Sequence, residues 1–216
     1  MILLLDTSSS QLSIGLADDD GALLNEFHAD AVEGERGIHD ARLAMEAANL
    51  LQSEGIAASA ISRIGIIIGP GSFTGLRIGL SFAKGLALAC GAGIVPMTLH
   101  EVLHAANPEH RGYIVTPGYR QDLFYLANSD APREIRLLSS TELSDLTPKP
   151  ILAHDFFLLH PSSFLPHPSF AALSLVTMSF LTAKSTELVS GAALDALEPL
   201  YLTEFNATRR PTMGQY

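Results

Sequence analysis

The stretch that decides the fold is Gly69-Pro70-Gly71-Ser72-Phe73-Thr74-Gly75. It follows residues 64–68, an apolar run broken by one glycine, which is typical of a central strand covered on both faces. It precedes residues 76–90, a segment with only three polar side chains that predicts a helix. A buried strand, a glycine-rich loop and a helix in this order indicate an α/β fold with a mixed sheet.

This loop could serve either of two purposes. It exposes backbone N–H groups, and Ser72 or Thr74 can cap the following helix, so an anion could bind at the helix N-terminus. It is not a Walker A loop, because Lys84 comes too late after the glycines. Alternatively, it is a turn required by the step from strand to helix, and the bulky Phe73 favours this interpretation. We therefore expect no cofactor here, and the vestigial candidates are Asp6, Gly71, Ser72, Thr74 and Gly75.

Upstream of the loop, the pattern predicts three antiparallel strands within residues 2–29 and a helix over Ile38–Ser53. The first strand ends at Asp6, which is either a metal-associated carboxylate or part of a turn with Thr7 and Ser8. We favour the turn. With a further short strand at residues 95–97, the expected order is βββαβαβ.

Both predicted helices carry more apolar surface than contact with one sheet requires. In the second helix, small residues recur every four positions from Gly75 to Ala87, which allows another helix to approach closely. Packing within the same chain is one interpretation, and packing against a partner is the one we favour. The expected interface residues are Leu43, Ala47, Leu50, Leu51, Gly79, Ala83, Leu86 and Ala87.

The second half of the chain restarts the same pattern in abbreviated form. Residues 112–116 and 122–128 predict strands, and residues 171–194 are helix-like. We expect two lobes, residues 1–107 and 108–216, with a mobile tail from about residue 203.

Composition excludes several classes of function. Lys and Arg number 13 against 23 Asp and Glu, a formal charge of −10, which disfavours direct nucleic-acid binding. Charged residues make up 17% and apolar residues 47%, so apolar surface could remain for a partner. The single cysteine, Cys90, cannot form an internal disulfide. The uncharged stretch from Gly85 to Leu99 is broken by Gly91, Gly93 and Pro96 and falls below the roughly 18 residues of a membrane span. These features predict a cytoplasmic protein with no membrane partner.

Several motifs together resemble the bacterial TsaB (YeaZ) family. They are the quoted loop with the residues up to Gly79, Asp6-Thr7-Ser8, Ala83-Lys84-Gly85-Leu86-Ala87 and Pro199-Leu200-Tyr201-Leu202. The resemblance implies an ASKHA (actin-like ATPase) type fold of two RNase H-like lobes, the second abbreviated. It also implies a non-catalytic subunit that heterodimerises with the catalytic paralogue TsaD, for threonylcarbamoylation of the adenosine adjacent to the anticodon in tRNA.

The resemblance further implies that a TsaE-like ATPase joins the complex. ATP and metal would lie on the partner subunits, and this chain would bind neither a cofactor, a metal nor tRNA by itself. Uncovered helices also predict a homodimer when the protein is free.

The sequence departs from the family pattern at three places. The catalytic paralogue holds its metal with a His-x-x-x-His pair, but His39 has Leu43 four residues later and Glu35 four residues earlier. Gly118-Tyr119-Arg120 stands where an Asp-Ala-Arg step is usual, and Thr203 replaces a basic residue. Two alternatives stay open: an ASKHA-type ATPase or phosphotransferase using Asp6 and the glycine loop, and a metallopeptidase.

Overall fold

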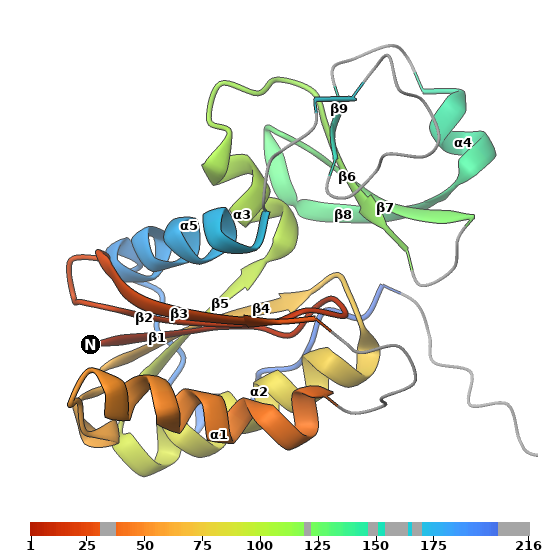
Figure 1. Cartoon of the computed structure of the whole chain (residues 1–216). Coiled ribbons are helices and arrows are strands. Elements are labelled where there is room, and N and C mark those ends of the chain that lie inside the picture. Colours follow the sequence, from red (N-terminus) through yellow and green to blue (C-terminus); the bar gives the residue numbers. More distant parts are fainter. Residues whose placement is uncertain (31–37, 119–121, 147–150, 154–163, 166–169, 203–216) are drawn as a thin grey trace, which may run out of the picture.

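The computed structural model describes residues 1–30, 38–118, 122–146, 151–153, 164–165 and 170–202. Its first sheet has five strands in the order β3-β2-β1-β4-β5 (Figure 1). They are β1 (Ile2–Asp6), β2 (Leu12–Ala17), β3 (Leu23–Ala29), β4 (Arg63–Gly69) and β5 (Gly93–Thr98). The first three strands pair antiparallel, whereas β1, β4 and β5 pair in parallel. The expected order βββαβαβ and the mixed sheet are confirmed.

Helices cover both faces of this sheet (Figure 1). On one face lie α1 (Ile38–Ser53) and α2 (Phe73–Cys90), and on the other lie α3 (Leu99–Ala106) and α5 (Phe170–Lys184). Because both faces are covered, every residue of β2 is buried, although its alternating pattern predicts a strand with only one face buried. The other face of β2 is covered by α5, whose Leu175 lies against Gly15. A segment far away in the sequence therefore completes this core.

The helix α2 is long and apolar enough to cross a membrane by length and composition alone, with a mean hydropathy of 1.2 over 18 residues. In this fold it lies along β4 and α1 and buries one row of side chains against them. Packing inside the protein therefore accounts for only part of its apolar character, since about a third of the helix is buried.

The second sheet repeats the topology of the first. Its strands are β6 (Tyr113–Pro117), β7 (Leu123–Asn128), β8 (Ala131–Ser139), β9 (Ile151–Ala153) and β10 (Phe164–Leu165). The order β8-β7-β6-β9-β10 matches β3-β2-β1-β4-β5 strand for strand, with the same parallel and antiparallel pairings. The helix α4 (Ser140–Ser144), which follows β8, has 5 residues, whereas α1, which follows β3, has 16. The second lobe is abbreviated, as expected.

The later part of the chain does not all pack with the second sheet. The helix α5 contacts β1, β2, β3 and β4 of the first sheet. Val189 pairs with Ile94 at the edge of β5, and Leu194, in the short helix α6 (Ala193–Ala196), enters the core beneath the first sheet. A lobe boundary between residues 107 and 108 would place α5, Val189 and Leu194 in the second lobe. In the structure they pack on the first sheet. The predicted tail from residue 203 lies outside the described residues.

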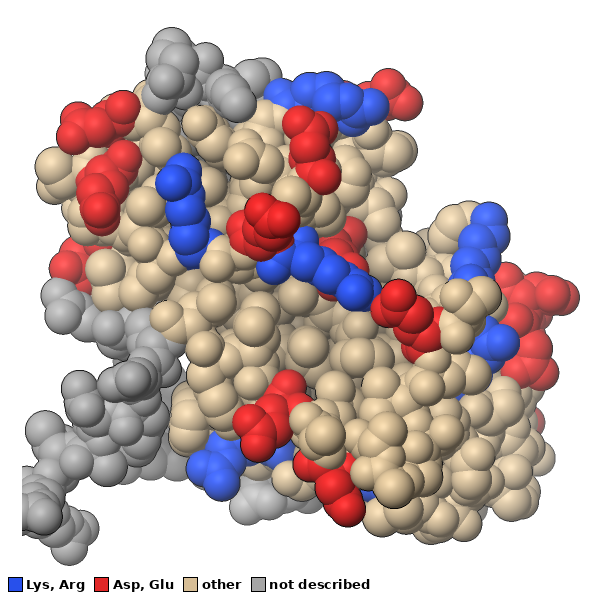
Figure 2. All heavy atoms as spheres, turned by 180° about the vertical axis from the view of Figure 1, so that it is seen from behind, with Lys and Arg blue, Asp and Glu red and all other residues tan. Residues whose placement is uncertain are grey.

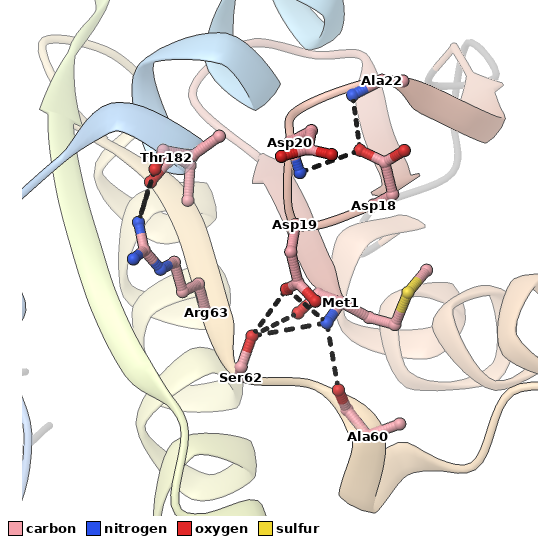
Figure 3. A network of polar contacts seen from close by, with 10 residues as sticks. Met1, Asp18, Asp19, Asp20, Ala22, Ala60, Ser62, Arg63 and Thr182 are labelled. Atoms are coloured by element: carbon pink, nitrogen blue, oxygen red, sulfur yellow. Dashed lines mark hydrogen bonds and ion pairs between the residues drawn. The ribbon is translucent and has the colours of Figure 1, made fainter.

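Polar contacts hold the end of the first sheet together (Figure 3). The amino group of Met1 donates to Asp19 Oδ1 at 2.7 Å and to the carbonyl oxygen of Ala60, in the short helix η1 (Ala58–Ala60), at 3.2 Å. Beside them, Arg63 Nη1 lies 2.9 Å from the carbonyl oxygen of Thr182 and 2.7 Å from that of Ala183. Arg63, the first residue of β4, thus caps the C-terminal end of α5.

Candidate functional site

The glycine loop lies between β4 and α2 and packs directly on the loop after β1. Ser72 is the N-cap of α2, and its hydroxyl oxygen accepts a hydrogen bond from the N–H of Gly75 at 3.2 Å. The N–H of Ser72 donates to the carbonyl oxygen of Ser8 at 2.6 Å. Of the two residues that could cap the helix, the structure selects Ser72.

The glycines of this loop are explained by close backbone approach. A Cβ atom at Gly71 would overlap the carbonyl oxygen of Ser8, and one at Gly75 would overlap that of Thr7. Gly69 has a φ of +141°, a conformation that L side chains rarely adopt. Close packing and backbone conformation therefore require glycine at these positions. This supports the interpretation of the loop as a turn between strand and helix.

Asp6 has a local role at the end of β1. Its Oδ1 accepts hydrogen bonds from the N–H of Ser8 at 2.9 Å and from the Ser8 hydroxyl at 2.7 Å. Only 8% of Asp6 is exposed. The turn that the sequence favoured for this carboxylate is confirmed.

The outer side of the glycine loop is covered by the segment before residue 203. The N–H of Leu200 donates to the carbonyl oxygen of Ile68 at 2.7 Å, and the Leu200 carbonyl lies against Gly69. The ring of Tyr201 lies on the ring of Phe73, with centroids 4.8 Å apart. Phe73 is half-buried and stacks on Tyr201.

The predicted interface residues lie mostly inside this subunit. Seven of them are buried in the core between the first sheet and its two helices, and Leu86 is half-buried against the same core. The buried residues are Leu43, Ala47, Leu50, Leu51, Gly79, Ala83 and Ala87. A bulky residue at position 79 or 83 therefore has no access to solvent in the free protein, because both positions are buried in this core.

The opposite sides of the same two helices face outward. Met45 of α1 is 51% exposed and Leu88 of α2 is 68% exposed. Smaller exposed residues surround them: Ala44, Ala48, Ser81, Gly85 and Ala89. The sequence of α2 thus holds a second row of small residues, at positions 81, 85 and 89, and this second row faces outward.

Sequence reasoning also overlooked a motif on α3. His100-Glu101-Val102-Leu103-His104 matches His-Glu-x-x-His, a pattern that binds zinc in metalloproteases when it lies on a helix. Here one Glu101 oxygen accepts from the N–H of Thr98 at 2.8 Å, in a capping box, and the other pairs with Arg133. His100 Nε2 donates to the carbonyl oxygen of Tyr125 at 3.3 Å.

Glu101 and His100 of this motif therefore have structural partners. Within the described part of the chain, no group of three or more His, Cys, Asp and Glu side chains could hold a metal ion. Burial lowers the pKa of His100 to about 4, so its imidazole is neutral at physiological pH. Of the family departures, Glu35, Tyr119, Arg120 and Thr203 lie outside the described residues, as does the side chain of His39.

Comparisons with known proteins agree with the motifs in the first lobe. The family model described as TsaD: tRNA N6-adenosine threonylcarbamoyltransferase matches residues 37–121. The tRNA threonylcarbamoyladenosine biosynthesis protein TsaB of Bacillus subtilis (strain 168) is 33% identical over 116 residues. These are 54% of this chain and 48% of that protein, so the chain spans about half the length of this relative.

Solved structures show the same fold. YeaZ from Pseudomonas aeruginosa superposes with a TM-score of 0.68 at 22% identity, over 93% of this chain and 99% of that one. A second structure, a protein with similarity to peptidase YEAZ from the same organism, gives 0.69 at 21% identity, over 94% and 99%. These matches confirm the resemblance to the TsaB (YeaZ) proteins. The fold is the actin-like ASKHA fold of YeaZ, with RNase H-like lobes.

The match to the TsaD family model lies in one part of the chain. The matched residues 37–121 include α1, the glycine loop, α2 and α3. This part contains both the architectural loop and the outward helix faces, so the candidate site is this side of the first lobe.

Proposed function

We propose that this chain is a non-catalytic subunit of a complex that forms threonylcarbamoyladenosine in tRNA. It binds a TsaD-like catalytic paralogue through the outward faces of α1 and α2 and favours the active conformation of that paralogue. A TsaE-like ATPase completes the complex. ATP and metal are bound by the partner subunits, and the complex works in the cytoplasm.

The observation that carries this proposal is the exposure of large apolar side chains on adjacent helices. Met45 and Leu88 are 51% and 68% exposed, on two helices that pack against each other over the same face of the sheet. Single exposed apolar residues are ordinary, but an apolar helix face with little charge is typical of a protein-binding surface. The same face gives the free protein a surface for homodimerisation.

The glycine loop supports a role without nucleotide chemistry. Its N-cap and its glycines are engaged with Thr7, Ser8 and Leu200 of the same chain. Within the described residues, no cluster of metal-binding side chains lies near it. This arrangement favours a binding subunit over the alternative of an ATPase or phosphotransferase.

The surface charge supports the absence of tRNA binding by the chain alone. The rear face shows isolated basic side chains separated by acidic ones and broad uncharged areas (Figure 2). With a formal charge of −10, the long-range field repels a polyanion.

The test is complex formation with the TsaD-like paralogue of the same organism, measured by calorimetry and sedimentation. Leu88→Asp and Met45→Asp should each weaken binding at least tenfold, since each buries a charge in an apolar contact. Val176→Asp is the matched control, because Val176 is 50% exposed on α5, on the opposite side of the sheet. The proposal fails if the wild-type protein forms no complex, or if reconstituted tRNA modification proceeds equally well without this chain.

A further inference from the structure

An aromatic and basic cluster lies at the N-terminal end of α2, where the end of the described chain meets the glycine loop. The ring of Tyr201 lies on that of Phe73, and the Arg77 guanidinium lies 5.3 Å from the Phe73 ring centre. Tyr201 is 41% exposed and Arg77 is exposed. The cluster therefore keeps Arg77 and part of Tyr201 at the surface, although the two rings pack on each other.

The cluster continues into the outward row of α2. At about 100° per residue, Arg77, Lys84 and Leu88 lie within about 60° of one another on the helix surface. Leu88 is the most exposed large apolar residue at the other end of this row. The row thus offers one cation and one aromatic ring at one end and an apolar side chain at the other.

The charge of this row is opposite to that of the protein. The helix α2 contains Arg77 and Lys84 and no acidic residue, in a chain whose formal charge is −10. Among the described carboxylates, none forms an ion pair with Arg77 or Lys84; the ion pairs of the other arginines join Arg42 to Glu46 and Arg133 to Glu101 and Glu187. A basic row with no ion pair to a carboxylate in the described part of the chain favours an acidic binding partner.

Tyr201 is held in place before any partner arrives. Its neighbour Leu200 is fixed by the hydrogen bond to Ile68, and one side of the Tyr201 ring is occupied by Phe73. A side chain that is already ordered loses little conformational entropy on binding. Burial raises the pKa of Tyr201, so its hydroxyl stays protonated and can donate a hydrogen bond at neutral pH.

We propose that Tyr201 and Arg77 anchor the docking surface, and that they bind a carboxylate-bearing helix of the catalytic paralogue. This inference rests on the proposed function and adds to it the residues that carry affinity and the chemistry of the partner. Tyr and Arg are the residue types that most often dominate binding energy at protein interfaces. The Arg77 guanidinium pairs with a carboxylate of the partner helix, and Leu88 packs on the apolar side of that helix.

The experiment compares charge reversal at two exposed arginines. Arg77→Glu should weaken binding to the purified paralogue at least tenfold, because an attractive pair becomes a repulsive one. Arg136→Glu, on β8 of the second sheet, makes the same change in net charge at another exposed site and should stay within about twofold of the wild type. Tyr201→Ala should weaken binding about tenfold with the fold intact by circular dichroism. Higher salt should weaken wild-type binding more than that of Arg77→Glu.

The outcomes separate this inference from the function on which it rests. If the wild-type chain does not bind the paralogue, the proposed function fails. If it binds, and Arg77→Glu and Tyr201→Ala bind equally well, the anchor is overturned and the function stands. If both variants abolish self-association and leave binding to the paralogue unchanged, this surface binds a second copy of the chain, and the inferred partner is wrong.

Discussion

Thr7 and Gly79 are in direct contact: a Cβ atom at position 79 would overlap Thr7 Oγ1. Thr7 is fully buried in the loop after β1, and Gly79 lies in the buried row of α2. Gly79→Ala should therefore destabilise the protein by about 1–3 kcal/mol, because the helix must move away from the sheet. Urea unfolding followed by circular dichroism measures the change.

Gly85, in the same helix, is the matched control. A Cβ atom there would meet nothing within 4 Å. Gly85→Ala should stabilise the protein by about 0.5–1 kcal/mol, since alanine favours the helix and restricts the unfolded chain. Equal effects at positions 79 and 85 would contradict the packing described here.

These two glycines show why the site was only partly predictable. Both stand in rows of small residues at four-residue spacing, and periodicity identifies such rows without saying which one faces the sheet. The sequence therefore indicated two helices for the proposed surface, but the residues it named lie on the side of each helix that the fold buries. The distinction depends on Thr7, which reaches the buried row from the loop after β1.

The fold was predictable where local signals are strong. The strands and helices up to residue 98 follow from apolar periodicity and from the glycine loop. The strands β9 and β10 have 3 and 2 residues, too few for a periodic signal. The helix α5 mixes apolar and hydroxyl side chains around its circumference, so nothing local assigns it to the first sheet. Contacts far apart in sequence, such as Arg63 with Thr182, place it there.

The N-cap of α2 gives a second prediction. Ser72→Ala should cost about 1 kcal/mol of stability, because the N–H of Gly75 loses its acceptor. Thr74→Ala should change stability by less than about 0.5 kcal/mol, since Thr74 is an exposed residue of the first turn. Thermal unfolding of the two variants side by side decides between them, and a larger loss for Thr74→Ala would show that the cap is misassigned.

Arg63 gives a third prediction. Its Nη1 lies 2.9 Å from the carbonyl oxygen of Thr182 (Figure 3). The carbonyl oxygens of Ala183 and Ser185 are also within hydrogen-bond distance, at 2.7 and 3.2 Å. Arg63→Met keeps most of the aliphatic stem but removes the donor, and should cost about 1–3 kcal/mol. Hydrogen exchange should show the loss of protection concentrated in α5. Arg136→Met is the control, because Arg136 is exposed on β8, and an equal loss there would rule out a specific role for Arg63.

The buried imidazole of His100 gives a prediction for acid stability. Burial lowers its pKa from 6.5 to about 4, and its Nδ1 has no hydrogen-bond partner within the described structure. Between these two pH values the unfolded chain binds a proton at this site that the folded protein does not. The contribution of His100 to stability is therefore complete above pH 6.5 and is lost as the pH falls toward 4, at up to about 1.4 kcal/mol per pH unit.

The variant His100→Gln should remove this dependence while keeping a donor for the carbonyl oxygen of Tyr125. Urea unfolding from pH 7.5 to 4 should then show a shallower decline than in the wild type, although the variant is less stable at pH 7.5. Glu46→Gln is the control for another pH range. A hydrogen bond from Arg42 lowers the pKa of Glu46 below 4.5, so its contribution is present above that pH and is lost only below it. Parallel curves for wild type and His100→Gln between pH 6.5 and 4.5 would mean that His100 is not held neutral by burial.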